Sequence, residues 1–262
     1  MRSPGDDGQY VLFADILGSG AAVEAEPHFL GSVYEGIYDG SSNVVLEAKS
    51  PLPSHRVAYS YTRFHAAVTD ILRDRVPDFW SIHTLIVFSD SVILASPSHH
   101  LADYARWLMQ RCISQGVAVR MGLGVGTFVV GRFASELTRQ RRVLASQLLG
   151  SGVVRAYWAE SAGVKGMRIL LHPSAAVALA GVRRANQLQL RALALPPSEL
   201  SARATHELCY VLQPDERDDE VLPSESLRVH VDQMSAAVEA KVLDHYSATT
   251  AALERMAAVV SG

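Results

Sequence analysis

The chain has 262 residues, of which 48% are hydrophobic and 19% charged, so it can bury a substantial core and is neither disordered nor fibrous in composition. Its formal net charge is −3, from 24 basic and 27 acidic residues, which provides no overall positive field for binding a nucleic-acid polymer. The two cysteines, Cys112 and Cys209, are too few for a disulfide framework or a cysteine-rich zinc site.

The N-terminus and the hydropathy pattern favour a cytoplasmic protein that does not insert directly into a membrane. The first ten residues carry two acidic side chains where a signal peptide needs a basic and then an apolar stretch. The sequence contains no run of about 18 apolar residues. We expect a catalytic domain over 1–213, with its core at 10–172, and an acidic loop and helix over 214–262.

The N-terminal part of the chain predicts a strand, two helices and a hairpin. The apolar run YVLFADIL at 10–17 ends in Gly-Ser-Gly and predicts a buried strand that leads into a glycine-rich turn. Helical spacing of apolar residues predicts helices over 27–38 and about 57–76, with a short strand at 44–47 between them. The segment HTLIVFSDSVILAS at 83–96 predicts a β-hairpin with Asp90 at its tip.

The rest of the chain adds helices and strands in alternation. The sequence predicts helices over 101–115, 150–162 and 174–185, and strands over 167–172 and 209–212. Between them, VAVRMGLGVGTFVVGRF at 117–133 predicts a strand pair whose glycines, Gly122, Gly124 and Gly126, share one face and allow something to approach closely. An apolar stripe from Leu227 to Tyr246 predicts one long C-terminal helix.

This order of elements predicts an α+β fold built on a ferredoxin-like βαββαβ core, with a C-terminal helical extension. Asp15 ends the first strand and Asp90 lies in the hairpin turn, so pairing of adjacent strands brings the two carboxylates together. Two close carboxylates repel each other unless a cation such as Mg²⁺ or Mn²⁺ neutralises them. A plainer interpretation stays open, in which Asp90 only forms the turn and Asp15 caps the following helix.

The surroundings of these residues resemble class III nucleotidyl cyclases. FADILG at 13–18 resembles the first metal-binding motif of that family, and FSDS at 88–91 resembles the second. VRMGLGVGTFVVG is similar to its glycine-containing strand pair, and LLGSGVVRAYWAESAG to its late helix. The four motifs occur in the family's order and cover about 10–172.

The resemblance implies a site for two Mn²⁺ or Mg²⁺ ions and a nucleoside triphosphate. Asp15 and Asp90, with the backbone carbonyl of Ile16, would bind the ions. The backbone N–H groups of the segment Leu17, Gly18, Ser19 and Gly20 would bind the triphosphate.

Several residues depart from the family's purine-specific pattern. Ile86 and Gln147 stand where adenylate and guanylate cyclases carry the side chains that read the base. The family's transition-state Asn and Arg fall on Val154 and Trp158, so Arg155, or Arg141 and Arg142, would have to substitute. For Arg155, a plain role as a surface helix residue stays open.

With these departures, the sequence resembles the pyrimidine cyclases of bacterial Pycsar anti-phage defence systems. That resemblance implies a homodimer with active sites at its interface, UTP as the favoured substrate, and cyclic UMP read by a separate cyclic-nucleotide effector. Tyr61 is a candidate to contact the smaller base, although its place on the apolar stripe of its helix favours core packing. Gln147 offers both a donor and an acceptor to a uracil edge. A cytidylate cyclase, a purine cyclase and a catalytically degenerate nucleotide sensor remain as alternatives.

Overall fold

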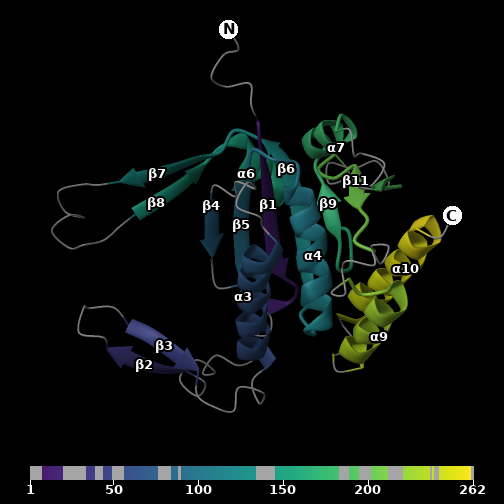
Figure 1. Ribbon diagram of the computed structural model, residues 1–262, viewed down its shortest axis with the longest axis horizontal. Helices are drawn as coiled ribbons and strands as arrows, with labels where there is room; N and C mark the ends of the chain where they lie inside the picture. The colour runs from purple at the N-terminus through teal and green to yellow at the C-terminus, as the bar shows by residue number, and fades with distance from the viewer. Residues whose placement is uncertain are drawn as a thin grey trace, which may run out of the picture.

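The computed structural model shows helices packed on a central β-sheet (Figure 1). It describes residues 8–19, 34–38, 44–48, 56–75, 84–87, 90–133, 145–182, 189–194, 202–211, 221–236, 238 and 242–260. Within this part of the chain, no helix is both long and apolar enough to span a membrane.

Four strands and two helices form the centre of the fold. In chain order they are β1 (Gln9–Ile16), α3 (Arg56–Arg75), β4 (Thr84–Val87), β5 (Ser91–Ser96), α4 (Leu101–Ser114) and β6 (Val119–Gly126). The strands lie side by side in the order β6-β1-β5-β4, and each neighbouring pair is antiparallel. This is the strand order of a ferredoxin-like βαββαβ unit, so the predicted α+β class and core topology are confirmed.

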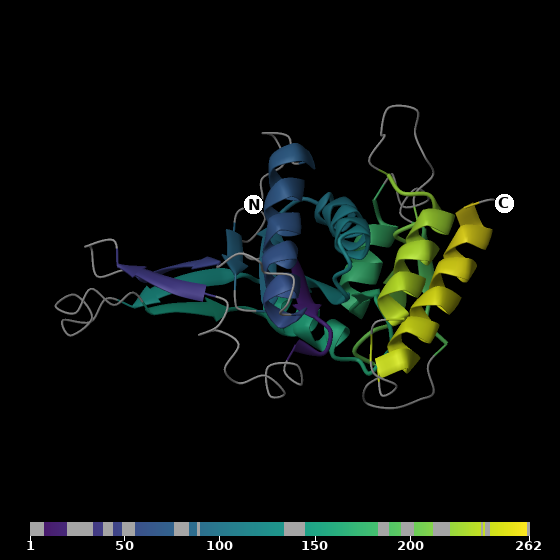
Figure 2. The same cartoon turned by 90° about the horizontal axis from the view of Figure 1, so that it is seen from below.

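The remaining elements extend this unit at one edge and add two ribbons. They are β2 (Tyr34–Tyr38), β3 (Val44–Ala48), β7 (Val129–Phe133), β8 (Ala145–Leu149), α6 (Ser151–Glu160), β9 (Ile169–Leu171), α7 (Pro173–Ala180), β10 (Leu190–Ala192), β11 (His206–Leu208), α9 (Ser224–Ser235) and α10 (Leu243–Val260). Strand β9 adds to β6 in parallel and is followed by β11 and β10, so the sheet has seven strands. The β2-β3 and β7-β8 ribbons project from the same side of the molecule (Figure 2).

The sheet separates two apolar layers because side chains alternate along each strand. Along β1, Leu12 and Ala14 belong to the large core that also contains α3 and α4. Val11 belongs to a smaller cluster on the other face, together with Ala156 of α6. Leu227 of α9 is fully buried in the large core, so the C-terminal extension packs against the same core as the sheet.

Helix α6 occupies the glycine face of β6. A Cβ atom on Gly122 would lie 2.0 Å from the carbonyl oxygen of Ala156, and one on Gly124 would lie 2.6 Å from the Ala156 nitrogen. These distances are too short for any side chain, so glycine is required for the helix to approach. The expected close approach at this face is therefore made by α6 itself.

Two expectations about strands are wrong. The predicted strand pair at 117–133 forms two strands, but β7 pairs with β8 rather than with β6, which pairs with β1 and β9. The predicted last strand at 209–212 lies earlier, at β11, while Cys209 to Val211 are buried without pairing in the sheet and Leu212 lies outside the described residues. Burial alone explains the apolar run at 209–211.

Two expectations about helices are also corrected. Residues 34–38 of the helix predicted over 27–38 form β2, which pairs with β3, and the rest of that range lies outside the described residues. Tyr and Ile are residue types that favour strands, so the apolar spacing that predicts a helix here is also compatible with a strand. The long C-terminal helix is in fact two helices, α9 and α10, which lie side by side (Figure 1).

Candidate active site

The structure brings Asp15 and Asp90 together at one end of the sheet. Strands β1 and β5 pair with Asp15 opposite Ser91, the residue that follows Asp90. The backbone N–H of Ile16 donates a hydrogen bond of 3.0 Å to the carbonyl oxygen of Asp90. The two acidic residues therefore meet where the first strand ends and the hairpin turns.

The acidic surroundings strongly affect the Asp15 carboxyl. Burial, followed by the negative charges of Asp90 and Glu160, raises its pKa from 3.8 to about 7, and the positive charge of Arg120 opposes this rise. In the absence of a cation, part of the Asp15 population is therefore protonated at neutral pH. A site that destabilises its own carboxylate in this way is suited to a divalent cation, which relieves the repulsion.

A serine holds the Asp90 carboxylate in place. The Ser19 hydroxyl donates a hydrogen bond of 2.6 Å to Oδ2 of Asp90, and Ser19 is only 8% exposed. Gly18, with a φ of +78°, makes the turn that returns Ser19 to the carboxylate. The backbone N–H of Leu17 donates to the carbonyl oxygen of Ala118 at 2.9 Å, so this group is already used and does not fit its expected role toward phosphate.

Five further candidates have limited or no structural description. Gly20, Arg141 and Arg142 lie outside the described residues. Only the backbones of Ile86 and Gln147 are described: Ile86 pairs with Ile93 in the hairpin, and Gln147 pairs with Gly131 in the β7-β8 ribbon. The roles of Ile86 and Gln147 toward a base therefore stay predictions.

Tyr61 on α3 lies within electrostatic reach of the carboxylates. Burial, then the charges of Asp90 and Asp15, raise the pKa of its phenol. The Tyr61 ring also packs partly against the large core. This position fits both of the roles considered for Tyr61, a contact with the base and core packing.

Arg155 lies far from the Asp15 carboxylate of its own chain. Its Nη1 donates a hydrogen bond of 2.7 Å to the carbonyl oxygen of Val125 on β6. Val125 pairs with Tyr10, five residues before Asp15, which corresponds to roughly 16 Å along the strand. Arg155 therefore belongs to the opposite end of the sheet, where its charge, after burial, lowers the pKa of the His172 imidazole.

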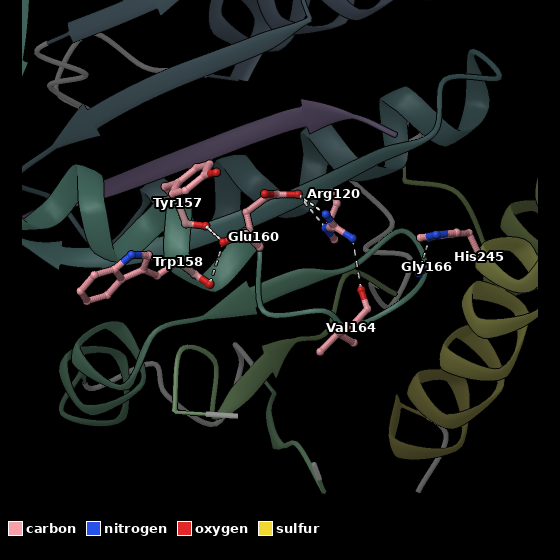
Figure 3. Close-up of polar contacts among 8 residues, drawn as sticks. Arg120, Tyr157, Trp158, Glu160, Val164, Gly166 and His245 are labelled. Carbon is pink, nitrogen blue, oxygen red and sulfur yellow. Dashed lines mark hydrogen bonds and ion pairs between the residues drawn. The ribbon is translucent and has the colours of Figure 1, made fainter. Parts of the chain in front are cut away.

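Arg120 and Glu160 also belong to the site, although neither residue is predicted from the sequence. Arg120 of β6 lies directly opposite Asp15 of β1. It forms an ion pair with Glu160 of α6, whose exposed fraction is only 4% (Figure 3). One signal was available: a charged residue within a glycine-rich apolar strand, next to the strand that carries Asp15. Glu160 gave no comparable signal, because only the packing of α6 on the sheet brings it there.

The oxygen ligands fit Mg²⁺ or Mn²⁺ better than a softer metal. Among the described residues, no group of three or more His, Cys, Asp or Glu side chains is arranged to hold a metal ion. Asp15 and Asp90 would therefore need to be completed by a backbone oxygen, water or the phosphates of a substrate.

Comparison with known proteins adds little to this geometry. No family model matches the sequence, and no curated protein matches it. Two solved structures, each described as a bacterial light-regulated adenylyl cyclase, are 14% identical to the chain and align with 87% of it. The TM-scores are 0.47 and 0.46, with 97% and 55% of those chains covered. A likeness at this level carries no conclusion about function.

Proposed function

We propose that the protein is a pyrimidine nucleotide cyclase that converts UTP to 3′,5′-cyclic UMP and pyrophosphate. The observation that carries the proposal is the meeting of Asp15 and Asp90 at strand ends of a βαββαβ sheet, within the motifs FADILG and FSDS. The raised pKa of Asp15 supports a cation-dependent site.

The proposed reaction is an intramolecular phosphoryl transfer. The ribose 3′-oxygen forms a bond to the α-phosphorus, the bond from that phosphorus to the bridging oxygen breaks, and pyrophosphate leaves with the electron pair. The proton of the 3′-hydroxyl passes to solvent. Two Mg²⁺ or Mn²⁺ ions held by Asp15, Asp90 and the Ile16 carbonyl would lower the pKa of the 3′-hydroxyl and neutralise charge on the phosphates.

The chain's own residues would prepare this site before substrate binds. Ser19 fixes the orientation of the Asp90 carboxylate through its 2.6 Å hydrogen bond. Arg120, opposite Asp15, offsets part of the negative charge that Asp90 and Glu160 place on that carboxyl. Gly18 and Ser19 form the turn beside which the triphosphate would lie. Together they hold two acidic ligands close despite their repulsion.

Base choice rests on the sequence departures. Ile86 and Gln147 replace the residues with which purine cyclases read their base, and Tyr61 lies near both carboxylates. A uracil edge accepts and donates hydrogen bonds, as the Gln147 amide does. We therefore expect UTP to be preferred over CTP, ATP and GTP.

The proposed active unit is a homodimer. The β7-β8 ribbon projects from the sheet (Figure 1). Large apolar side chains are exposed on this ribbon and on α6. They are Val129, Val130, Leu149, Val154, Tyr157 and Trp158, each at least 38% exposed. In the proposed homodimer, the Arg155 that completes a site comes from the other copy, because Arg155 of the same chain lies at the opposite end of the sheet. An exposed apolar surface of this kind is typical of an interface.

Incubation with Mn²⁺ and each nucleoside triphosphate in turn, with products identified by mass, tests the function. The expected product is cyclic UMP from wild type and none from Asp90→Asn. Cyclic AMP or cyclic GMP as the main product would replace the proposal with a purine cyclase. Tight nucleotide binding without any product would favour the sensor, as expected if Val154 and Trp158 leave the site without transition-state groups.

A further inference from the structure

The guanidinium of Arg120 is held on two sides. Its Nε donates to Oε1 of Glu160 at 2.7 Å, and its Nη2 lies 2.6 Å from the same oxygen. On the other side, Nη1 donates to the carbonyl oxygen of Val164 at 3.4 Å. Figure 3 shows Arg120 between these two partners. The cation opposite Asp15 is therefore held mainly by Glu160 and is also in contact with the loop at 161–168.

Helix α10 fixes that loop. The backbone N–H of Gly166 donates to Nδ1 of His245 at 3.2 Å, and that of Met167 donates to Oγ1 of Thr249 at 2.9 Å. The Thr249 hydroxyl donates in turn to the carbonyl oxygen of His245 at 2.7 Å. Because its proton is committed there, the Thr249 oxygen is left to accept from Met167. Thr249 is fully buried, so water cannot replace it as the acceptor.

The contact between loop and helix is too close for a side chain at Gly166. Its φ is +99°, and a Cβ atom there would lie 3.0 Å from Oγ1 and 3.1 Å from the backbone nitrogen of Thr249. Only glycine fits this conformation and this distance without strain. The bare backbone of Gly166 therefore lets α10 approach the loop directly.

These contacts form one continuous path from the C-terminal helix to the candidate active site. We propose that Thr249 is a positioning residue, which holds the loop at 164–167 so that Arg120 remains beside Asp15. This inference rests on the proposed function and adds a role for the C-terminal extension in it. Loss of the Thr249 hydroxyl releases the loop, and Arg120 then samples positions in which it no longer offsets the acidic pair.

The test compares Thr249→Val with Thr249→Ser, which keeps the hydroxyl. Hydrogen exchange of the Arg120 Nε–H, followed by NMR on protein with ¹⁵N-labelled arginine, reports the ion pair directly and needs no substrate. Thr249→Val should accelerate this exchange and lower cyclase turnover, each by roughly two- to thirtyfold, the range typical of coupling through packed networks. Thr249→Ser should restore both quantities. Thr250→Val, the same substitution one residue along α10, should change neither.

A second pair of variants covers the case in which Thr249→Val does not fold. His245→Phe removes the acceptor for the Gly166 N–H, and His245→Asn offers an oxygen in its place. Faster Arg120 exchange in the first and recovery in the second support the inference. Faster exchange of the Gly166 amide in His245→Phe, or of the Met167 amide in Thr249→Val, with unchanged Arg120 exchange would overturn it. If wild type turns over no nucleotide, the proposed function fails, while Arg120 exchange still decides the inference.

Discussion

Replacing Asp15 by Asn should stabilise the metal-free protein at pH 8. In the folded protein the pKa of Asp15 is about 7, against 3.8 for an unperturbed aspartate. Between these values the folded state holds a proton that the unfolded chain has released. The stability that the folded protein gains from binding this proton is therefore complete below pH 3.8 and is lost as pH rises through 7. Asn carries no charge, so the variant avoids this loss.

The size of the effect follows from the same values. At about 1.36 kcal/mol for each pH unit, a pKa rise from 3.8 to about 7 corresponds to an upper bound of about 4 kcal/mol. The Asp15 carboxyl is only partly buried, and water screening reduces this to roughly 1 to 2 kcal/mol. For a chain of this length the expected increase in Tm is roughly 2 to 8 °C.

Thermal unfolding in EDTA at pH 5.5 and pH 8 measures the effect. Wild type should lose more stability than Asp15→Asn between the two pH values, and Asp232→Asn, at an exposed position on α9, should behave like wild type. Added Mn²⁺ should raise the Tm of wild type at pH 8 but not that of Asp15→Asn, because binding favours the ionised carboxylate. An Asp15→Asn variant less stable than wild type at pH 8 would show that burial and the neighbouring charges do not destabilise the Asp15 carboxylate.

Three further predictions test packing, base choice and assembly. Gly124→Ala should destabilise the fold by about 1 to 3 kcal/mol in urea unfolding, because its Cβ would lie 2.6 Å from the Ala156 nitrogen. Tyr61→Phe should keep the Tm of wild type but reduce the preference for UTP over CTP in kcat/KM by about tenfold. Asp15→Asn and Arg155→Ala should each be inactive alone, and an exchanged mixture should recover about a quarter of wild-type activity, since half the dimers have one intact site.

Each of these predictions has an outcome that contradicts it. Unchanged urea unfolding of Gly124→Ala would show that α6 does not contact the glycine face. A Tyr61→Phe variant with unchanged base preference would assign Tyr61 to the core. Mixed dimers seen by native mass spectrometry but without activity would show that Arg155 does not complete the partner's site.

The elements around the acidic pair could be predicted because local signals agree with the fold there. The apolar run that ends at Gly18 predicts one strand and its end, and the two apolar runs on either side of Asp90 predict a hairpin. Antiparallel pairing of these strands then brings Asp15 to Asp90. The glycines of β6 also gave a correct signal of close approach, although the sequence does not say that α6 makes the contact.

The rest of the site depends on contacts that leave little trace in local sequence. The Arg120–Glu160 pair joins residues 40 positions apart, and it exists only because α6 packs on the glycine face. Leu227 of α9 and Tyr246 of α10 are both buried, so the apolar periodicity does not reveal that the helix is interrupted between them. The pairing of β7 with β8 likewise leaves no local signal, because the sequence of a strand does not specify which other strand it pairs with.

Competition among the four nucleoside triphosphates tests both the proposed reaction and the proposed substrate. Purified protein is incubated with Mn²⁺ and an equimolar mixture of UTP, CTP, ATP and GTP, and both cyclic monophosphates and pyrophosphate are quantified by mass and enzymatic assay. We expect cyclic UMP as the main product, formed one-to-one with pyrophosphate. With Asp15→Asn or Asp90→Asn we expect neither cyclic UMP nor pyrophosphate. Release of phosphate without any cyclic product, or full turnover by either variant, would contradict the proposed reaction.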